Sequence, residues 1–370
     1  MQDAQPRWPL DDVFVIDSTV HGYNTTLENH VDGIFKERVA IQLSDTLYAG
    51  HSKLIPDGDP KWALSRERFR HAADPDLMAQ ALFAESQTDV CIYHGTPLYG
   101  IYRDGGSPLS VGRAMRERYP DRVALYGPVS PWQPDALDLI DQLVEEDKVV
   151  GLKFYPMDLV DGEVKSYRLD DPEIAFPLLE KARKLGVKMI ATHKAIPQGQ
   201  VPSEPFAPFD VAGAATAFPY LTFEVVHGGI AFLEETAWQM QRFPNVTVNL
   251  EGSSAYLLQR SPRRFAELLG SLLVWGGEDR IFWATGCVAH HPRPFIELFW
   301  DFQIPDDMCE GFGYPKLTEA MKRQILGLNH ARFLGWNVAA LRQRLAGDEF
   351  GRLAALAPPW SQAAQQERAA

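Results

Sequence analysis

The chain has 370 residues, 45% of them hydrophobic and 23% charged, so it can bury a large core. Its 36 basic and 49 acidic residues give a net charge of −13, which opposes nonspecific attraction to nucleic acid and anionic membranes. Three scattered cysteines are too few for a disulfide framework, and no apolar run is long enough to cross a membrane. The amino-terminal segment has no apolar signal core, so we expect a cytoplasmic protein.

Eight short apolar runs, rich in β-branched and aromatic residues, predict strands that are buried on both faces. They lie at 13–17, 89–95, 123–129, 149–156, 187–193, 221–229, 246–252 and 280–286. Helix-like segments precede the fourth, fifth, seventh and eighth runs, at 134–147, 172–186, 230–244 and 261–277. This alternation is typical of the α/β class and predicts a (β/α)8 TIM barrel.

The segments outside this alternation indicate how the single barrel domain, 1–370, is completed. The interval after the first run is much longer than the others, so we expect residues 22–88 to form an insertion or lid over the barrel mouth. The aromatic run 295–302 has helical spacing, and 317–336 resembles a closing carboxy-terminal helix. The Ala- and Gln-rich end, 358–370, predicts a tail.

Polar residues cluster where the predicted strands end, which is where a TIM barrel places its active site. A single histidine at such a position is more often a core residue than a ligand, but six of the ten histidines fall there. Converging imidazoles with a carboxylate are ligands for Zn, Fe or Mn. The strand-end residues are Asp17, His21, His94, Lys153, His193, His227, Glu251, His290 and His291.

Three motifs, "GLKFYP", "VHGGIAFLEE" and "FPNVTVNLE", together with this order of strand-end groups, carry a resemblance to a known family. The chain resembles the amidohydrolase-related branch of the metal-dependent amidohydrolase superfamily, which includes decarboxylases and C–C hydrolases. The resemblance implies that His193 and His227 are the histidines of strands five and six. It also implies that His21 is the second histidine of the strand-one pair.

Two departures from the family pattern shape the expected site. Thr19 stands where the first histidine of the strand-one pair would be, and Thr285 or Gly286 where the strand-eight aspartate would be. Neither Thr285 nor Gly286 can act as a general base. We therefore expect His291 to replace the lost ligand and Glu251 to supply the missing negative charge. His290 is expected to be a supporting or surface group.

The expected metal ligands are thus His21, His193, His227, Glu251 and His291, with Asp17 as a further candidate. They would hold one or two divalent transition-metal ions, with Fe or Mn favoured and Zn the alternative. We expect His227, Lys153 and Glu251 to be catalytic. Two roles stay open for Lys153: a carbamylated bridge between two metals, as the superfamily implies, or a cation that pairs with Glu251 or a substrate carboxylate.

A His-rich site without the hydrolytic aspartate is similar to the dinuclear oxygenases of the 2-aminoisobutyrate hydroxylase type. This resemblance predicts a dinuclear Fe/Mn hydroxylase or monooxygenase that takes electrons from separate electron-transfer proteins. The alternatives are a mononuclear Zn/Mn hydrolase or nonoxidative decarboxylase, or a Zn-holding accessory subunit of such a hydroxylase. In each case we expect an oligomer, with a related barrel as a possible partner, and a small substrate whose carboxylate contacts Arg103 or Lys153.

Overall fold

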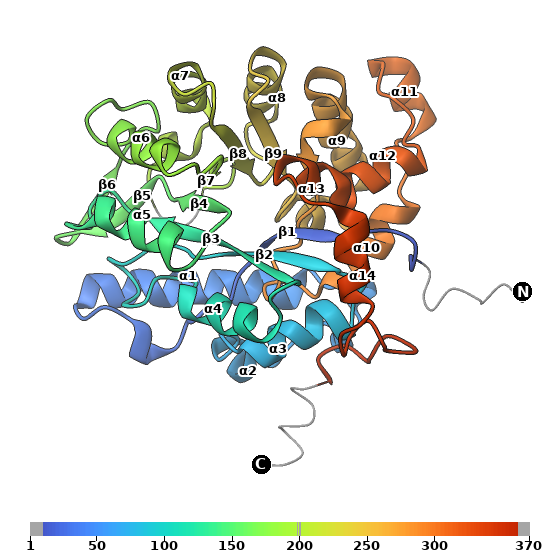
Figure 1. The fold of residues 1–370 in the computed structure, drawn as a ribbon, viewed down its shortest axis with the longest axis horizontal. Helices are drawn as coiled ribbons and strands as arrows, with labels where there is room; N and C mark the ends of the chain where they lie inside the picture. The colour runs from blue at the N-terminus through green and yellow to red at the C-terminus, as the bar shows by residue number, and fades with distance from the viewer. Residues whose placement is uncertain (1–9, 198, 200, 362–370) are drawn as a thin grey trace, which may run out of the picture.

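The computed structural model describes residues 10–197, 199 and 201–361, and its centre is a parallel sheet that curls into a barrel (Figure 1). In the described chain the sheet has eight strands, neighbours in the order β1-β2-β3-β4-β7-β8-β9-β10. The predicted (β/α)8 barrel is confirmed. The strands are β1 (Ile16–Val20), β2 (Val90–His94), β3 (Val123–Val129), β4 (Gly151–Phe154), β7 (Met189–His193), β8 (Thr222–Val226), β9 (Val246–Asn249) and β10 (Ile281–Phe282).

Hydrogen bonds between the first strand and the segment at and after β10 close the barrel. The Ser18 amide donates to the Trp283 carbonyl at 2.9 Å, and the Gly286 amide donates to the Thr19 carbonyl at 3.0 Å. Closure leaves no free sheet edge in this region. It also brings the loop after the eighth strand directly beside the end of the first.

Helices surround the barrel and close its lower end. Between and after the strands lie α1 (Ile34–Lys53), α2 (Arg66–Arg70), α3 (Pro75–Ala79), α4 (Leu109–Arg118), α5 (Ala136–Glu145), α6 (Phe176–Lys184), α7 (Phe209–Ala217), α8 (Leu233–Arg242), α9 (Pro262–Gly276), α10 (Pro292–Asp301), α11 (Asp306–Phe312), α12 (Glu319–Arg323), α13 (Asn329–Phe333) and α14 (Val338–Leu345). A hairpin that the sequence did not predict, β5 (Met157–Val160) and β6 (Glu163–Ser166), follows β4.

Side chains alternate between the two faces of each strand, which divides the barrel interior into layers. In β7, Met189 and Ala191 belong to an apolar cluster with Phe282 and with Leu341 of α14, whereas Ile190 packs into the large outer core. The apolar cluster plugs the lower end. Residues two positions further along each strand therefore point into the upper half of the barrel.

A hydrogen-bonded polar layer lies above this plug. Glu224 of β8 is fully buried and accepts from Asn249 Nδ2 at 2.5 Å and from the Tyr126 hydroxyl at 3.2 Å. The Tyr126 hydroxyl also contacts His330 Nε2 at 3.0 Å, and His330 Nδ1 lies 2.7 Å from the Ser18 hydroxyl. Burial raises the pKa of Glu224 to about 7. The layer is a satisfied polar floor beneath the barrel mouth.

The long segment after β1 contains α1, which is tied to the loop after β10. The Leu64 amide donates a hydrogen bond to His51 Nε2 of α1, at 2.6 Å, so the hydrogen of the neutral ring is on Nδ1. His51 Nδ1 donates to the Ala289 carbonyl at 2.9 Å. Leu43 and Gly50 of α1 line the cavity at the barrel mouth. This placement supports the expected lid role of residues 22–88, which remains a prediction.

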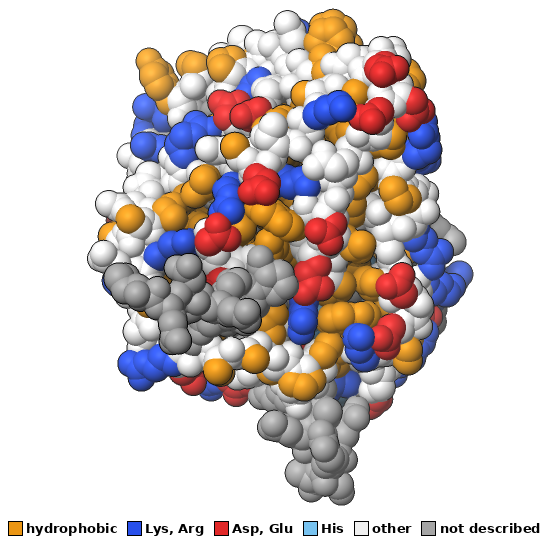
Figure 2. Space-filling model, turned by 90° about the vertical axis from the view of Figure 1, so that its right-hand side faces the viewer, with side chains coloured by type: hydrophobic (Ala, Val, Ile, Leu, Met, Phe, Trp, Pro, Cys, Tyr) orange, Lys and Arg blue, Asp and Glu red, His pale blue; other side chains and the backbone are white. Residues whose placement is uncertain are grey.

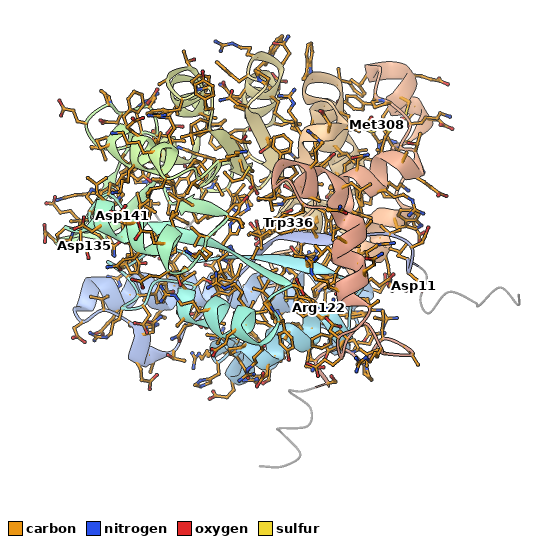
Figure 3. The ribbon with its side chains drawn as sticks, in the orientation of Figure 1. Asp11, Arg122, Asp135, Asp141, Met308 and Trp336 are labelled. Carbon is orange, nitrogen blue, oxygen red and sulfur yellow. The ribbon has the colours of Figure 1, made fainter. Side chains whose placement is uncertain are left out.

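The carboxy-terminal segment is anchored at two places. Arg122, labelled in Figure 3, forms a two-pronged ion pair with Asp348, at 2.5 and 2.9 Å, and donates to the Asp89 carbonyl at 3.0 Å. Further on, Trp360 is buried although the tail was expected from 358 onward. Residues 362–370 of that expected tail lie outside the described residues.

On the face shown in Figure 2, acidic and basic side chains are interspersed around apolar stretches. The net negative charge is therefore not gathered into a single acidic patch on that face. In the part of the chain that the structure describes, no helix combines the length and apolar character needed to cross a membrane.

The Arg122 anchor gives a stability prediction. Arg122→Ala should lower the free energy of unfolding by about 2–3 kcal/mol, because it leaves Asp348 without its two-pronged partner and removes a hydrogen bond to the barrel. Urea denaturation measures the change. Arg344→Ala is the matched control, since that arginine pairs with Asp121 on an exposed surface, and it should cost about 0.5 kcal/mol or less. Equal effects would show that the anchor contributes no more than a surface pair.

Candidate metal centre and active site

Six strand-end residues expected from the sequence line one cavity at the barrel mouth. Its volume is about 90 Å³, and its wall includes four tyrosines. Period-two alternation explains two of the tyrosines, because Tyr23 and Tyr155 each follow a site residue by two positions. From this two-residue spacing, Tyr23 and Tyr155 could have been predicted as site residues. The charged and aromatic lining residues are His21, Tyr23, Tyr102, Lys153, Tyr155, His193, His227, Glu251, Tyr256 and His290.

Each of the three central imidazoles is held at one ring nitrogen by a backbone carbonyl. His21 Nδ1 donates to the His94 carbonyl at 2.9 Å, His193 Nε2 to the Ile196 carbonyl at 3.0 Å, and His227 Nδ1 to the Glu251 carbonyl at 3.1 Å. Because carbonyls only accept, these nitrogens carry the hydrogens. The lone pairs therefore reside on the opposite nitrogens, the arrangement that orients histidines for a metal.

Two of these free nitrogens face each other. His227 Nε2 lies 3.0 Å from His193 Nδ1, and two facing lone pairs at this distance repel. Either a proton shared between them or a bound cation removes the repulsion. Burial, and then the nearby cations, lower the pKa of His193 well below its usual value. On the other side of the pair, the second nitrogen of His227 lies beside the Glu251 carboxylate.

Glu251 is the buried anion of the cavity. Its Oε2 lies 2.5 Å from His227 Nδ1, although that N–H points at the Glu251 carbonyl, so the carboxylate contact is electrostatic. Burial acts to raise the pKa of Glu251, but the cations around it, His227 first, bring the pKa down to about 2. The carboxylate is therefore ionised in the neutral pH range.

Gly286 makes room for this carboxylate. A Cβ at residue 286 would lie 2.4 Å from Glu251 Oε1, closer than any real contact allows, and the backbone φ of +72° already favours glycine. Gly286 is one of the two positions where the sequence placed the missing strand-eight carboxylate. The Glu251 side chain, arriving from the end of β9, fills that space. This geometry supports the expected substitution of one carboxylate by the other.

Lys153 is a buried cation without a hydrogen-bond partner. Its side chain is 1% exposed, and its Nζ has no hydrogen-bond partner within the described residues. Burial lowers the pKa of Lys153 to about 8, while the carboxylates of Glu251 and Glu224 oppose the shift. An ammonium that lines a cavity with donors to spare is suited to bind an anionic group.

The structure corrects the expected role of His291. Its Nε2 lies 3.0 Å from Glu85 and its Nδ1 accepts the Arg293 amide hydrogen, so neither nitrogen is directed into the cavity. The side chain instead caps α10 and packs against Trp360. Its neighbour His290 lines the cavity, because successive residues of a turn point in different directions. His290 therefore lies in the cavity, where His291 was expected, and His291 lies outside it.

Other candidates also lie away from the cavity. Asp17 is fully buried and accepts from the Thr285 amide, at 2.9 Å, and from its hydroxyl, so it holds the β10 end in place. His94 stacks on Tyr126 below the mouth and offers only its carbonyl to His21. Arg103 pairs with Asp32 on the surface and does not reach the cavity, which leaves Lys153 as the cation there.

The chemistry of the imidazoles fits a divalent metal, although the site is not closed around one point. Within the described ranges, no group of three or more His, Cys, Asp or Glu side chains is gathered in a metal-holding arrangement. The direct contact between His193 and His227 accounts for this, because a metal on either nitrogen has to separate the two rings. His21, His193 and Glu251 supply two nitrogens and an oxygen, donors that Zn and Mn accept.

A family model described as amidohydrolase matches residues 103–336, more than half of the chain. The chain belongs to the amidohydrolase family. The resemblance inferred from the motifs is thereby confirmed. No curated protein matches the sequence.

Solved structures share the amidohydrolase barrel at low sequence identity. The uncharacterized TIM-barrel protein Bb4693 from Bordetella bronchiseptica has a TM-score of 0.61 at 16% identity, covering 87% of this chain and 99% of that one. The 2,6-dihydroxybenzoate decarboxylase from Rhizobium has a TM-score of 0.52 at 16% identity, with 87% and 99% covered. A dihydroxybenzoic acid decarboxylase from Polaromonas sp. JS666, with bound manganese and the inhibitor 2-nitroresorcinol, has 0.52 at 14%, with 89% and 98% covered.

These comparisons do not support the expected dinuclear oxygenase. None of the similar structures described above is named an oxygenase, and the position of His291 removes one of the five ligands on which the dinuclear site was built. What remains is the family assignment and a cavity lined by imidazole and carboxylate donors. The hydrolase and decarboxylase alternatives therefore fit the amidohydrolase barrel better.

The space around Glu251 can be tested by filling it. Gly286→Ala should lower the free energy of unfolding by about 2–4 kcal/mol, because the methyl group meets the carboxylate as well as an unfavourable φ. Gly313→Ala is the matched control, since its φ is +71° and nothing lies within 4 Å of the added carbon. It should cost about 1 kcal/mol. Equal losses in thermal and urea unfolding would mean that Glu251 moves aside freely.

The corrected position of His291 makes a second prediction. His291→Ala should lower the free energy of unfolding by about 2–4 kcal/mol, since it leaves a buried cavity and takes a partner from Glu85. The metal content of the purified protein should not change. Elemental analysis and urea denaturation of the same sample measure both. A variant that keeps its stability but loses metal would restore His291 as a ligand.

Proposed function

We propose that the protein is a divalent-metal-dependent, nonoxidative decarboxylase of a ring-bearing carboxylic acid. The observation that carries this proposal is the cavity itself, in which the unpartnered Lys153 ammonium lies among four tyrosines beside three anchored imidazoles. Decarboxylases of dihydroxybenzoates with the same fold support it. The Mn and Zn alternatives for the metal are both retained.

The cavity can bind such an acid through complementary contacts. The Lys153 ammonium can donate to the carboxylate, and the tyrosine rings can pack against an aromatic or other planar ring. Tyr155 is already stacked toward His193, with ring centroids 4.3 Å apart, so a bound ring would lie close to the imidazoles. Because the cavity is largely closed, little water would remain around the carboxylate.

A metal ion in this cavity would be held by His21, His193 and Glu251. Bound there, it would supply Lewis acidity that stabilises negative charge as the C–C bond breaks.

His227 is the residue suited to move a proton. Its Nδ1 is fixed by Glu251, and the adjacent carboxylate stabilises the imidazolium form. When CO₂ leaves, the electron pair of the broken bond stays on the ring carbon. The proton on His227 Nε2 can then be transferred to that carbon, and solvent returns a proton to the imidazole. No oxidant or reductant takes part.

The proposed reaction leaves an isotopic signature. With Mn- or Zn-loaded enzyme and a panel of hydroxybenzoates in D₂O, the product should carry deuterium at the carbon that lost CO₂. Chelation of the metal should abolish turnover. Release of CO₂ and mass spectrometry of the product measure the outcome, whereas hydrolysis of an amide or C–C bond without CO₂ release would contradict the proposal.

Variants of Lys153 and His227 should affect different kinetic constants, because Lys153 is proposed to bind the substrate and His227 to transfer the proton. Lys153→Met should reduce kcat/KM about tenfold to a hundredfold, mainly through KM, because it removes a charge-assisted contact to the carboxylate. His227→Asn should instead lower kcat. Leu137→Ala on the exposed face of α5 is the control and should leave both constants unchanged.

A further inference from the structure

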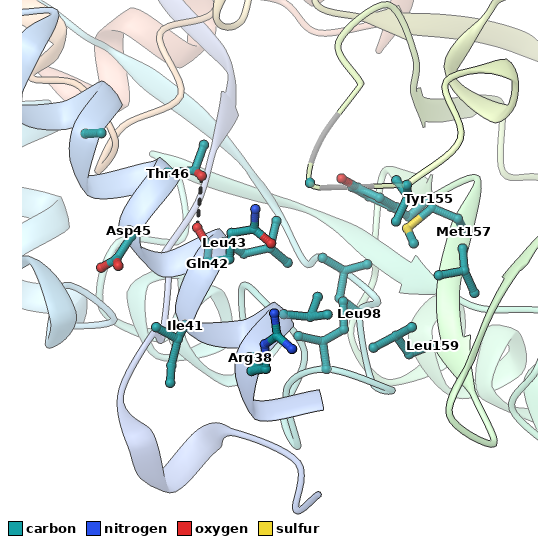
Figure 4. Close-up of a pocket in the computed structure, with 16 residues that line it drawn as sticks. Arg38, Ile41, Gln42, Leu43, Asp45, Thr46, Leu98, Tyr155, Met157 and Leu159 are labelled. Atoms are coloured by element: carbon teal, nitrogen blue, oxygen red, sulfur yellow. Dashed lines mark hydrogen bonds between the residues drawn. The ribbon is translucent and has the colours of Figure 1, made fainter. Parts of the chain in front are cut away.

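A second hollow lies directly outside the catalytic cavity, between α1 and the β5–β6 hairpin (Figure 4). Its volume is about 700 Å³. Ile41 and Leu43 of α1 form one wall, and Met157, Leu159 and Val164 of the hairpin form the other. We call this hollow the α1 groove.

The α1 groove adjoins the catalytic cavity. Four residues, Leu43, Thr46, Leu98 and Tyr155, line both hollows. Tyr155 faces His193 with its ring on one side and borders the groove on the other. A molecule whose head group lies in the cavity can therefore extend past Tyr155 and Leu98 into the groove.

The sizes of the two hollows indicate how a ligand is divided between them. Pockets that enclose small molecules usually measure roughly 300–1,000 Å³. The catalytic cavity, at about 90 Å³, is well below this range, whereas the α1 groove, at about 700 Å³, falls within it. The cavity has room for a reacting head group, and the remainder of a larger molecule has to lie in the groove.

The lining of the groove indicates what that remainder is made of. Leu98, Met157 and Leu159 are buried apolar side chains in its lining, whereas Ile41 and Val164 are 46% and 37% exposed. Its lining includes only two charged residues, Arg38 and Asp45, among the described residues. Covering this apolar surface with a polar chain would gain little, whereas burying methylene or aryl groups is favourable.

We propose that the α1 groove binds the apolar tail of the substrate, so that the substrate is an amphiphilic acid with an extended aliphatic or aryl tail. The position of the head rests on the proposed function, since it places the carboxylate at Lys153. The groove, not the catalytic cavity, selects among acids by the length of the tail.

The experiment measures binding of unreactive acids by isothermal titration calorimetry to the full-length protein. Hexanoate, octanoate and decanoate share the carboxylate and differ only in the tail. Affinity should rise about fourfold for each methylene that enters the groove. Ile41→Glu and Val164→Glu should weaken decanoate at least tenfold and change hexanoate much less. Both side chains are exposed, so the variants should fold.

Leu137→Glu on α5 is the matched control, because Leu137 is 44% exposed and lies outside the groove. It should leave decanoate binding unchanged. Equal affinities for hexanoate and decanoate would overturn the proposal. So would a loss of decanoate affinity in Leu137→Glu as large as the loss in Ile41→Glu or Val164→Glu. So would a dimer in sedimentation that Ile41→Glu dissociates, since the groove would then be covered by a second copy.

Lys153→Met separates this inference from the proposed function. Affinity could still rise with the length of the tail even if Lys153 does not bind the carboxylate. In that case Lys153→Met will not change the affinity for decanoate, and decanol will bind as tightly as decanoate. That result would keep the groove and remove Lys153 as the carboxylate site. If Lys153→Met binds decanoate more weakly and affinity still rises with tail length, the result supports both the groove and Lys153 as the carboxylate site.

Discussion

A single buried carboxylate determines the arrangement of the barrel mouth. Glu251 is ionised although it is buried, and an isolated charge in such a place is costly unless cations or hydrogen-bond donors surround it. His227 lies against it, and Lys153 interacts with it across the cavity. Gly286 is the steric condition for this arrangement, because any Cβ there would occupy the position of the carboxylate. The site is thus built from one anion and the cations that it retains.

The barrel supports this arrangement from below. The polar floor around Glu224 and Tyr126 satisfies the buried groups beneath the mouth, and the apolar plug beneath it excludes water from the lower end. The backbone carbonyls of the β2, β7 and β9 ends fix the ring orientations of the three imidazoles. The lone pairs are therefore directed before any ligand arrives, which reduces the cost of binding. The backbone thus orients the rings, while the proposed selection among substrates depends on α1 and the β5–β6 hairpin above them.

The sequence predicted the barrel and much of the site because both follow from periodicity. Continuous apolar runs define buried strands, and parallel strands bring their carboxyl ends together. This is why His21, Lys153, His193, His227 and Glu251 line one cavity, while their roles stay a prediction. The geometry of the loop after β10 could not be predicted in this way. His290 and His291 are adjacent in sequence, and only the backbone path decides that the first lines the cavity while the second reaches Glu85. The hairpin and the groove were missed for a similar reason, since short surface strands carry little periodic signal.

We propose that this cavity binds one divalent metal through His21, His193 and Glu251. The most direct measurement is anomalous diffraction from crystals of the protein grown with manganese. We predict a single anomalous peak bonded to His21, His193 and the Glu251 carboxylate, with the rings of His193 and His227 moved apart. A peak at His290 or His291, two peaks bridged by Lys153, or no peak in a cavity where Lys153 pairs with Glu251 would contradict the account.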